Sequence, residues 1–264
     1  MRFLKMLYAD TIRHVIVLSK RYWVSRVTDV IAFYIIFIGI YFALSSITGF
    51  NSAEKTKIIA GQIAGYMAFY FASMILAVID QLLYEEIRQG TLEQLMISPH
   101  SLLSIISSHL LASLELDILT AVPLFFLLTL TTGIQIYFNW QMVVVFALIL
   151  CGVYGLALII GGLTLIFKRT GQLAYIFQIL FLGLGFSSVS NLPKIVQSVS
   201  ELLPFTRGVM LLKDYAMGNG QGLIFRSPDF LYLLVNTFIY ISVGILFFDI
   251  CTSFVKGRGT FAQY

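Results

Sequence analysis

Long apolar segments alternate with short polar segments along most of this chain. Six segments are rich in Ile, Leu, Val, Phe and Ala and carry few charges: 27–47, 58–79, a stretch within 101–131, 141–167, 172–189 and 230–248. About 20 apolar residues in a helix cross the ~30 Å hydrocarbon core of a bilayer. The segments are continuously apolar rather than alternating, which disfavours a transmembrane barrel. The pattern predicts an all-α, polytopic membrane protein with six transmembrane helices.

The composition points to the same class. Of the 264 residues, 59% are hydrophobic and 11% are charged, whereas a typical soluble domain has about 25% charged residues. A water-soluble surface is therefore excluded. The net charge is +4, but the basic residues lie next to the predicted spans. Membrane topology and anionic lipid explain them better than a nucleic-acid partner does.

The first 26 residues predict an amphipathic helix that lies flat in the membrane interface. One face of it carries apolar and aromatic side chains at helical spacing: Leu4, Leu7, Tyr8, Ile12, Val15 and Tyr22. The other face carries basic side chains: Arg2, Lys5, Arg13 and Lys20. Tyr22 and Trp23 suit the level of the lipid head groups.

Six spans place both termini on the same side, and the positive-inside rule says which side that is. The segments on the side of the termini hold 11 basic residues: Arg2, Lys5, Arg13, Lys20, Arg21, Arg26, Arg88, Lys168, Arg169, Lys256 and Arg258. The opposite segments hold 6: Lys55, Lys57, Lys194, Arg207, Lys213 and Arg226. Both termini are therefore expected in the cytoplasm.

Residues 82–98 form a charged island between the second and third spans. Gly90 is expected to end a helix in a left-handed cap. Thr91, with Gln94 three residues later, fits a capping box. Ser98 followed by Pro99 fits the N-cap and first position of the next helix. The island thus predicts a helix that stops, turns and starts again on the cytoplasmic side.

The short helix predicted inside the island is amphipathic. Leu92, Leu95 and Met96 would form an apolar stripe, and Glu93 and Gln94 would face away. Such a helix, tied to two spans, is able to transmit force from a partner. Charge-paired contacts to that partner would come from Glu85, Glu86, Arg88 and Glu93. The alternative is a solvated loop whose charges only maintain topology.

The stretch "EEIRQGTLEQLMISPHS" resembles the cytoplasmic signature of type-2 ABC exporter permeases, in which an acidic residue precedes a Gly-Thr-Leu-Glu-x-Leu run and then Ser-Pro. Eight residues stand in place: Glu86, Gly90, Thr91, Leu92, Glu93, Leu95, Ser98 and Pro99. Elsewhere the chain agrees in outline, with an interfacial N-terminal helix, six spans and a proline-broken segment before the last span.

The resemblance implies that 82–98 is a coupling region that docks on a nucleotide-binding ATPase subunit. The implied coupling residues are Glu85, Glu86, Arg88, Gly90, Thr91, Leu92, Glu93 and Leu95. It also implies short re-entrant helices in the outer leaflet within 191–228. The whole chain, 1–264, would then be one transmembrane permease domain in a plasma membrane, of bacterial origin.

The ATPase itself is not expected in this chain. No Gly-x-x-x-x-Gly-Lys-[Ser/Thr] phosphate loop occurs, and the glycine-rich stretch "GNGQGLIF" lacks the lysine. We therefore expect no cofactor here, and ATP and Mg²⁺ on a partner chain. Six spans suggest a half-transporter that pairs with a second copy or a related permease. His14, His100 and His109 show no metal-ligand spacing, and no catalytic set is recognisable.

Polar residues recur within two of the predicted spans and are candidates for lining a transport pathway. They are Gln62, Tyr66, Tyr70 and Ser73 in the second span and Gln172, Tyr175 and Gln178 in the fifth. Polar side chains avoid lipid, so these faces are expected to line a pathway or to form hydrogen bonds between helices. The sequence leaves both interpretations open.

Glu115 and Asp117 lie in the third apolar segment. An acidic side chain in mid-bilayer costs about 2.5–3.5 kcal/mol and would mark a substrate or proton site. If the membrane part starts near Ala112, both acids instead lie near the cytoplasmic interface. The rival function is a stand-alone secondary transporter or channel that uses these acids for ion coupling. Nothing in the sequence identifies the cargo.

Overall fold

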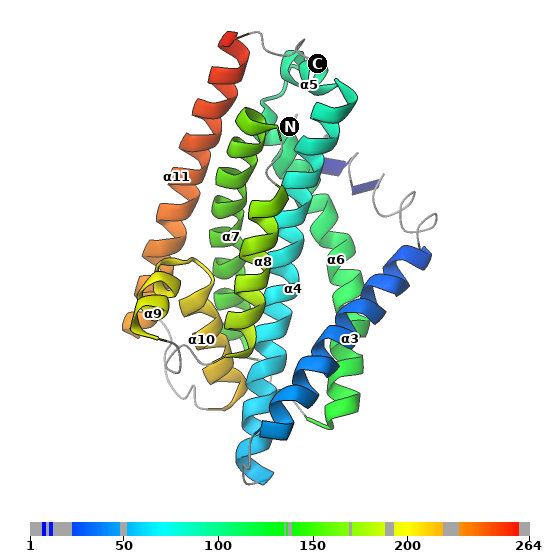
Figure 1. Ribbon diagram of the computed structural model, residues 1–264, viewed down its shortest axis with the longest axis vertical. Helices are drawn as coiled ribbons and strands as arrows, with labels where there is room; N and C mark the ends of the chain where they lie inside the picture. The colour runs from blue at the N-terminus through cyan, green and yellow to red at the C-terminus, as the bar shows by residue number, and fades with distance from the viewer. Residues whose placement is uncertain are drawn as a thin grey trace.

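The computed structural model describes residues 7–8, 11–12, 23–47, 52–134, 136, 139–168, 171–187, 193–218 and 227–258. Nearly all of these residues are helical, and no strand occurs among them. The prediction of an all-α membrane protein is therefore confirmed. Figure 1 shows that the long helices run side by side in one elongated bundle.

Five of the described helices are long and apolar enough to cross a membrane. They are α3 (Trp23–Ile47), α4 (Ser52–Gln89), α6 (Leu102–Thr132), α7 (Trp140–Phe167) and α11 (Pro228–Arg258). The fifth predicted span, 172–189, corresponds to α8 (Gly171–Phe186), which has 16 residues and extends about 24 Å. The six predicted spans are thus five helices of spanning length and one shorter apolar helix.

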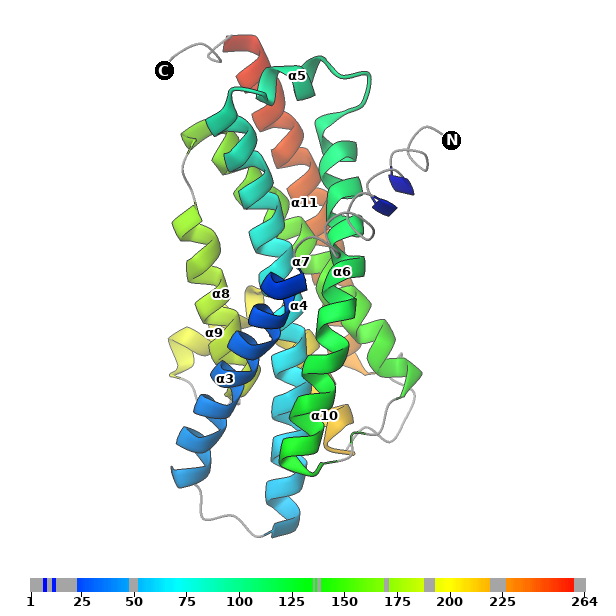
Figure 2. The same ribbon diagram turned by 90° about the vertical axis from the view of Figure 1, so that its right-hand side faces the viewer.

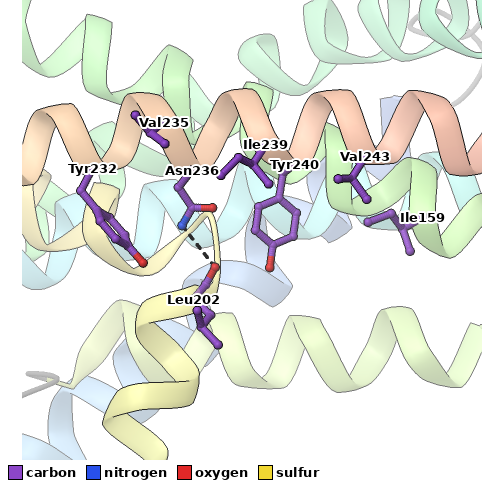
Figure 3. Close-up of a pocket in the computed structure, with 8 residues that line it drawn as sticks. All are labelled: Ile159, Leu202, Tyr232, Val235, Asn236, Ile239, Tyr240 and Val243. Atoms are coloured by element: carbon purple, nitrogen blue, oxygen red, sulfur yellow. Dashed lines mark hydrogen bonds between the residues drawn. The ribbon is translucent and has the colours of Figure 1, made fainter.

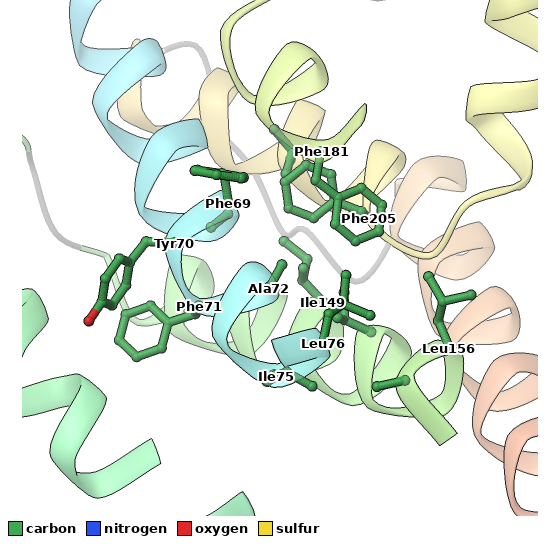
Figure 4. Close-up of a cluster of buried hydrophobic side chains, with 14 of the residues drawn as sticks. Phe69, Tyr70, Phe71, Ala72, Ile75, Leu76, Ile149, Leu156, Phe181 and Phe205 are labelled. Carbon is green, nitrogen blue, oxygen red and sulfur yellow. The ribbon is translucent and has the colours of Figure 1, made fainter. Parts of the chain in front are cut away.

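The centre of the bundle is α4, a helix of 38 residues that is about 57 Å long. Its membrane window is 78% buried, because α6, α7 and α8 all pack against it. Figure 4 shows part of this core, with Ala72 and Leu76 of α4 beside Ile149 of α7. Phe181 of α8 stacks on Phe205 with 4.4 Å between the ring centroids.

A glycine pair brings α7 and α11 into close contact. A Cβ atom on Gly155 would lie 2.3 Å from the carbonyl oxygen of Tyr240, and a Cβ on Gly244 would lie 2.3 Å from that of Gly155. No side chain fits between these backbones. The missing side chains allow the two helices to approach closely, as small residues do in membrane interfaces.

The first helix of spanning length, α3, lies on the outside of the bundle. Only 6% of its membrane window is buried, and Figure 2 shows it crossing in front of α4 and beside α6. Its attachment to α4 is aromatic: the rings of Phe37 and Tyr66 have centroids 5.2 Å apart, and those of Phe33 and Tyr70 lie 4.8 Å apart. The helix begins at Trp23, four residues before the predicted span.

The amphipathic helix predicted over 1–26 falls almost entirely outside the described residues. Within it, Leu7, Tyr8, Thr11 and Ile12 are helical, and residues 23–26 belong to α3. The proposed position in the membrane interface therefore stays a prediction.

Two short helices lie between α8 and α11 in the described part of the chain. They are α9 (Lys194–Leu202) and α10 (Thr206–Ala216), and Figure 1 places them at the end of the bundle remote from α5 (Leu92–Ile97). α10 packs against α4, α7 and α11. Short helices are thus present within the predicted segment 191–228, of which residues 193–218 and 227–228 are described.

Candidate functional site

The charged island forms a tight corner, residues 82–98, at one end of the bundle. α4 ends at Gln89, and Gly90 follows with φ of +70°. The backbone N–H of Gly90 donates to the carbonyl of Ile87 at 3.2 Å, and that of Thr91 donates to the carbonyl of Glu86 at 3.1 Å. These two bonds form a Schellman motif, which satisfies carbonyls at the helix end. The predicted glycine cap is confirmed.

The predicted capping box at Thr91 is wrong. Thr91 has φ −93° and ψ −3°, and its side chain forms no capping bond to α5. Its hydroxyl instead donates to the carboxylate Oε2 of Glu86 at 2.5 Å. The Schellman turn brings the two side chains together, and a bond to a charged carboxylate is stronger than a bond between neutral groups. The backbone N–H of Thr91, which the Gln94 side chain would accept in a capping box, donates instead to the carbonyl of Glu86. This bond joins the last turn of α4 directly to the start of α5.

The predicted helix start at Ser98-Pro99 is also wrong. Ser98 is the C-cap of α5, with ψ of 147°, and α6 begins only at Leu102. The N-cap is Ser101, whose hydroxyl oxygen accepts from the backbone N–H of Ser104 at 3.2 Å. Proline holds the residue before it in an extended conformation, so the chain needs three more residues to turn into the next helix.

The two faces of α5 differ as predicted. Leu92 is buried, Leu95 and Met96 are half-buried, and Glu93 and Gln94 are exposed. On the outer face of the corner Glu85 and Arg88 are exposed as well, and Glu86 is half-buried.

Sequence reasoning missed the most exposed apolar side chain of the corner, Ile97, which is 83% exposed at the end of α5. The missed signal was an isoleucine that falls outside the apolar stripe.

The polar candidates on α4 point into the bundle. Tyr66 and Tyr70 are 0% and 1% exposed, and Ser73 is also buried, while Gln62 is half-buried. The Tyr66 hydroxyl donates to the carbonyl of Phe33 on α3 at 2.5 Å. The Ser73 hydroxyl donates to the Tyr70 carbonyl at 2.7 Å. In this conformation α3 covers these tyrosines.

The polar candidates on α8 have different environments. The side-chain amide of Gln178 donates to the carbonyl of Ser73 at 3.2 Å, which links α8 to α4. Gln172 is exposed and Tyr175 is 65% exposed on the outer surface. The structure thus brings Gln178 and Ser73 together and leaves Gln172 and Tyr175 apart from them. A role in lining a pathway stays a prediction for all of these residues.

The two acidic residues of α6 lie in separate environments. Asp117 is 3% exposed, and its Oδ1 lies 3.3 Å from Nη1 of Arg26 at the start of α3. Its Oδ2 and the hydroxyl of Tyr70 are both buried without a hydrogen-bond partner among the described residues. Glu115 is exposed and accepts a bond from the Thr11 hydroxyl at 3.4 Å. The acids therefore do not form one paired site.

Two further polar links join elements of the bundle. Asp80 lies within α4 and accepts a bond from the hydroxyl of Thr164 on α7 at 2.8 Å. Lys213 of α10 donates to the carbonyls of Leu184 and Ser187 at 2.9 and 2.7 Å. These bonds satisfy carbonyls at the C-terminal end of α8, where a cation is also favoured by the helix dipole.

Burial lowers the pKa of Lys213 to about 8, and the neighbouring Asp214 acts in the opposite direction. Room for the lysine side chain comes from Gly65 on α4, where an added Cβ would lie 2.7 Å from Cε of Lys213. A glycine on α4 and a lysine on α10 thus fix the end of the short helix α8 together.

These features define a multi-pass, all-helical membrane protein with a hydrogen-bonded, charged corner at one end. The model of the ABC-2 type transporter family matches residues 12–217. The chain therefore belongs to the ABC-2 type transporter family and is a membrane permease of ABC-type transport. The match includes the corner and all of the polar candidates, and α11 lies beyond it. No curated protein matches the chain.

Proposed function

We propose that this chain is the transmembrane subunit of an ATP-driven exporter and that the α4–α5 corner receives the force of a separate ATPase subunit. The observation that carries the proposal is the rigid junction at the corner. The Schellman cap at Gly90, the bond from Thr91 to Glu86 and the burial of Leu92 all hold α5 on the end of α4. A displacement of α5 would therefore move α4.

The length of α4 supports this role. It runs about 57 Å without interruption from the corner to the opposite end. α6, α7, α8 and α10 all contact it. A push at the corner would reach each of these neighbours through packed side chains, and close packing transmits displacement well.

The ATPase would contact the exposed side chains of the corner. Glu85, Arg88 and Glu93 offer charge pairs, and Ile97 offers an apolar anchor. ATP and Mg²⁺ would bind on the partner, because this sequence lacks a phosphate loop. Lys168, the half-buried C-cap of α7, and Lys256, exposed in the last turns of α11, lie on the same side as the corner, which favours a cytoplasmic position for that side.

A second permease copy or a related permease would complete the pathway. The outer face of α8, with Gln172, Tyr175 and the exposed Ile176 and Ile179, is available to line it. Tyr66 and Tyr70 would contribute only after α3 moves away from α4, because α3 covers them now. Ser73 would contribute only after α8 moves, because Gln178 of α8 bonds to its carbonyl.

The test uses the permease purified with its ATPase in liposomes. Exchange of Glu93 for Lys is expected to weaken the ATPase contact about fivefold, the factor that ~1 kcal/mol represents, and to lower transport-coupled ATP hydrolysis. Ile97→Asp is expected to act in the same direction. The control is Lys194→Glu, a charge reversal on an exposed residue at the remote end of the bundle. Wild-type coupling in both corner variants would refute the proposal.

One observation favours the rival function, an ion-coupled transporter that works alone. The Oδ2 atom of Asp117 is buried without a hydrogen-bond partner in the described part of the chain, as a proton-carrying carboxylate would be. The exposed position of Glu115 does not support a paired acid site. Cargo flux driven by a proton or sodium gradient in liposomes without the ATPase would favour this function.

A further inference from the structure

A groove runs along the outer side of α11 at the end of the bundle that holds α9. Its volume is about 440 Å³. The lining comes from α7, α9 and α11: Ile159, Leu202, Tyr232, Val235, Asn236, Ile239, Tyr240 and Val243. Figure 3 shows the α11 side chains in a row along one flank, with Leu202 of α9 facing them. The groove lies on a helix of spanning length whose membrane window is only 28% buried.

The α9 end of the groove is polar and firmly built. The side-chain amide of Asn236 donates to the carbonyl of Leu202 at 3.2 Å, and the Tyr232 hydroxyl donates to the carbonyl of Glu201 at 3.0 Å. Arg207 lies over the Tyr232 ring at 5.4 Å. These contacts hold α9 against the first turns of α11, so the groove is a fixed feature of the fold.

The charge at this end is negative. Arg207 forms ion pairs with Glu201 at 3.2 Å and with Asp229 at 2.9 Å. Two carboxylates therefore share one guanidinium, which leaves one negative charge on the cluster of Arg207, Glu201 and Asp229. The side chains of Glu201 and Asp229 are 30% and 50% exposed, so both are accessible to a cationic group.

The shape and lining of the groove favour a hydrocarbon chain. From Tyr232 to Val243 α11 rises about 17 Å, and over this length the lining is apolar except for Tyr232, Asn236 and Tyr240. The groove lies on a helix of spanning length that is mostly exposed, where lipid acyl chains are the neighbouring molecules.

We propose that this groove binds one acyl chain of a glycerophospholipid whose head group carries an ammonium, as phosphatidylethanolamine does. The acyl chain lies along the apolar side chains of Val235, Ile239 and Val243. A hydrocarbon chain needs no polar contact there. The ammonium lies beside Glu201 and Asp229, where their excess negative charge stabilises it. The polar cluster is at the start of α11, so the acyl chain runs from there toward the middle of the membrane. This binding does not depend on the proposed export function.

The first test measures retained lipid. The full-length protein is purified in mild detergent from membranes that contain both phosphatidylethanolamine and phosphatidylglycerol, washed, and analysed by mass spectrometry. The wild type is expected to keep about one phosphatidylethanolamine per chain. Ile239→Trp fills the groove and is expected to keep about tenfold less, because loss of two buried methylene groups already has that effect. Leu246→Trp, an exposed residue of α11 outside the groove, is the matched control.

Several outcomes would overturn the proposal. Equal retention by wild type and Ile239→Trp is one, and retention of phosphatidylglycerol in place of phosphatidylethanolamine is another. If Ile239→Trp is not monodisperse, Val243→Trp at the deep end of the groove replaces it.

The second test concerns the head group. Glu201→Gln combined with Asp229→Asn is expected to shift the retained lipid from phosphatidylethanolamine toward phosphatidylglycerol, because Arg207 then leaves a net positive charge. An unchanged lipid ratio would overturn the head-group assignment.

A third measurement uses Ile239→Cys in a Cys151→Ser, Cys251→Ser background. Efficient disulfide formation between two protein chains would show that a second copy of the protein covers the groove. That result would overturn the proposal that a lipid occupies it.

Discussion

The hydroxyl of Thr91 donates to the carboxylate of Glu86 at 2.5 Å across the corner between α4 and α5. The backbone N–H of Thr91 donates to the carbonyl of the same residue at 3.1 Å. A side-chain bond and a backbone bond thus both connect the start of α5 to the last turn of α4.

Removal of the Thr91 hydroxyl is expected to loosen the corner. Thr91→Val keeps the shape of the side chain and loses a charge-assisted hydrogen bond, which costs about 1–2 kcal/mol at this partly buried site. Hydrogen exchange of the amides from Thr91 to Leu95 is expected to become faster, while exchange in the middle of α4 stays unchanged. Thr91→Ser keeps the hydroxyl and serves as the control. Equal protection in the valine and serine variants would contradict the role of this bond.

Gly90 is expected to resist substitution because of its backbone conformation and not because of space. Its φ is +70°, and a Cβ there would have no neighbour within 4 Å. Gly90→Ala therefore costs about 1–2 kcal/mol of left-handed strain. Thermal unfolding in detergent measures the effect as a lower Tm.

A matched control exists at Gly39, which lies within α3 and also has open space around a Cβ. Gly39→Ala is expected to leave the Tm unchanged or to raise it, because alanine favours a helix over glycine by about 1 kcal/mol. Equal shifts in the two variants would argue against strain at Gly90.

Gly155→Ala is expected to separate α7 from α11. The new Cβ would lie 2.3 Å from the carbonyl oxygen of Tyr240, and a backbone atom cannot rotate away as a side chain does. The expected cost is about 1–3 kcal/mol or more, seen as a lower Tm in detergent. Gly183→Ala, where a Cβ has no neighbour within 4 Å, is expected to be neutral. A neutral result at Gly155 would show that the two helices do not pack as described.

The ion pair of Arg26 and Asp117 is expected to hold α3 on α6. Arg26→Met leaves the 3% exposed Asp117 without its cation and is expected to cost about 1–3 kcal/mol. Asp117→Asn in the same chain removes the unpaired charge and is expected to restore part of the loss. A double-mutant cycle on the free energy of unfolding measures the coupling. Additive effects of the two changes would mean that the residues do not interact.

Parts of the corner could be read from the sequence because they depend on local rules. Gly90 has the left-handed conformation that its position before a short helix predicted. The two faces of α5 follow from helical spacing alone, so the burial of Leu92 and the exposure of Glu93 were predictable. The predicted N-caps of α5 and α6 were wrong because nearby residues compete for the same hydrogen bonds. Ser101, and not Ser98, caps α6. The Thr91 side chain binds Glu86 and not the N-terminus of α5.

The membrane class, the number of apolar helices and the turn at Gly90 were determined by the sequence alone, since hydropathy and local backbone preference act over a few neighbouring residues. Only the tertiary structure decided which polar side chains are buried and what they contact. Arg26 and Asp117 are 91 positions apart, Lys213 and the Leu184 carbonyl are 29 positions apart, and the groove beside α11 joins residues of three separate helices. Such contacts depend on how each helix is rotated and packed against its neighbours, which the spacing of residues within one helix does not specify.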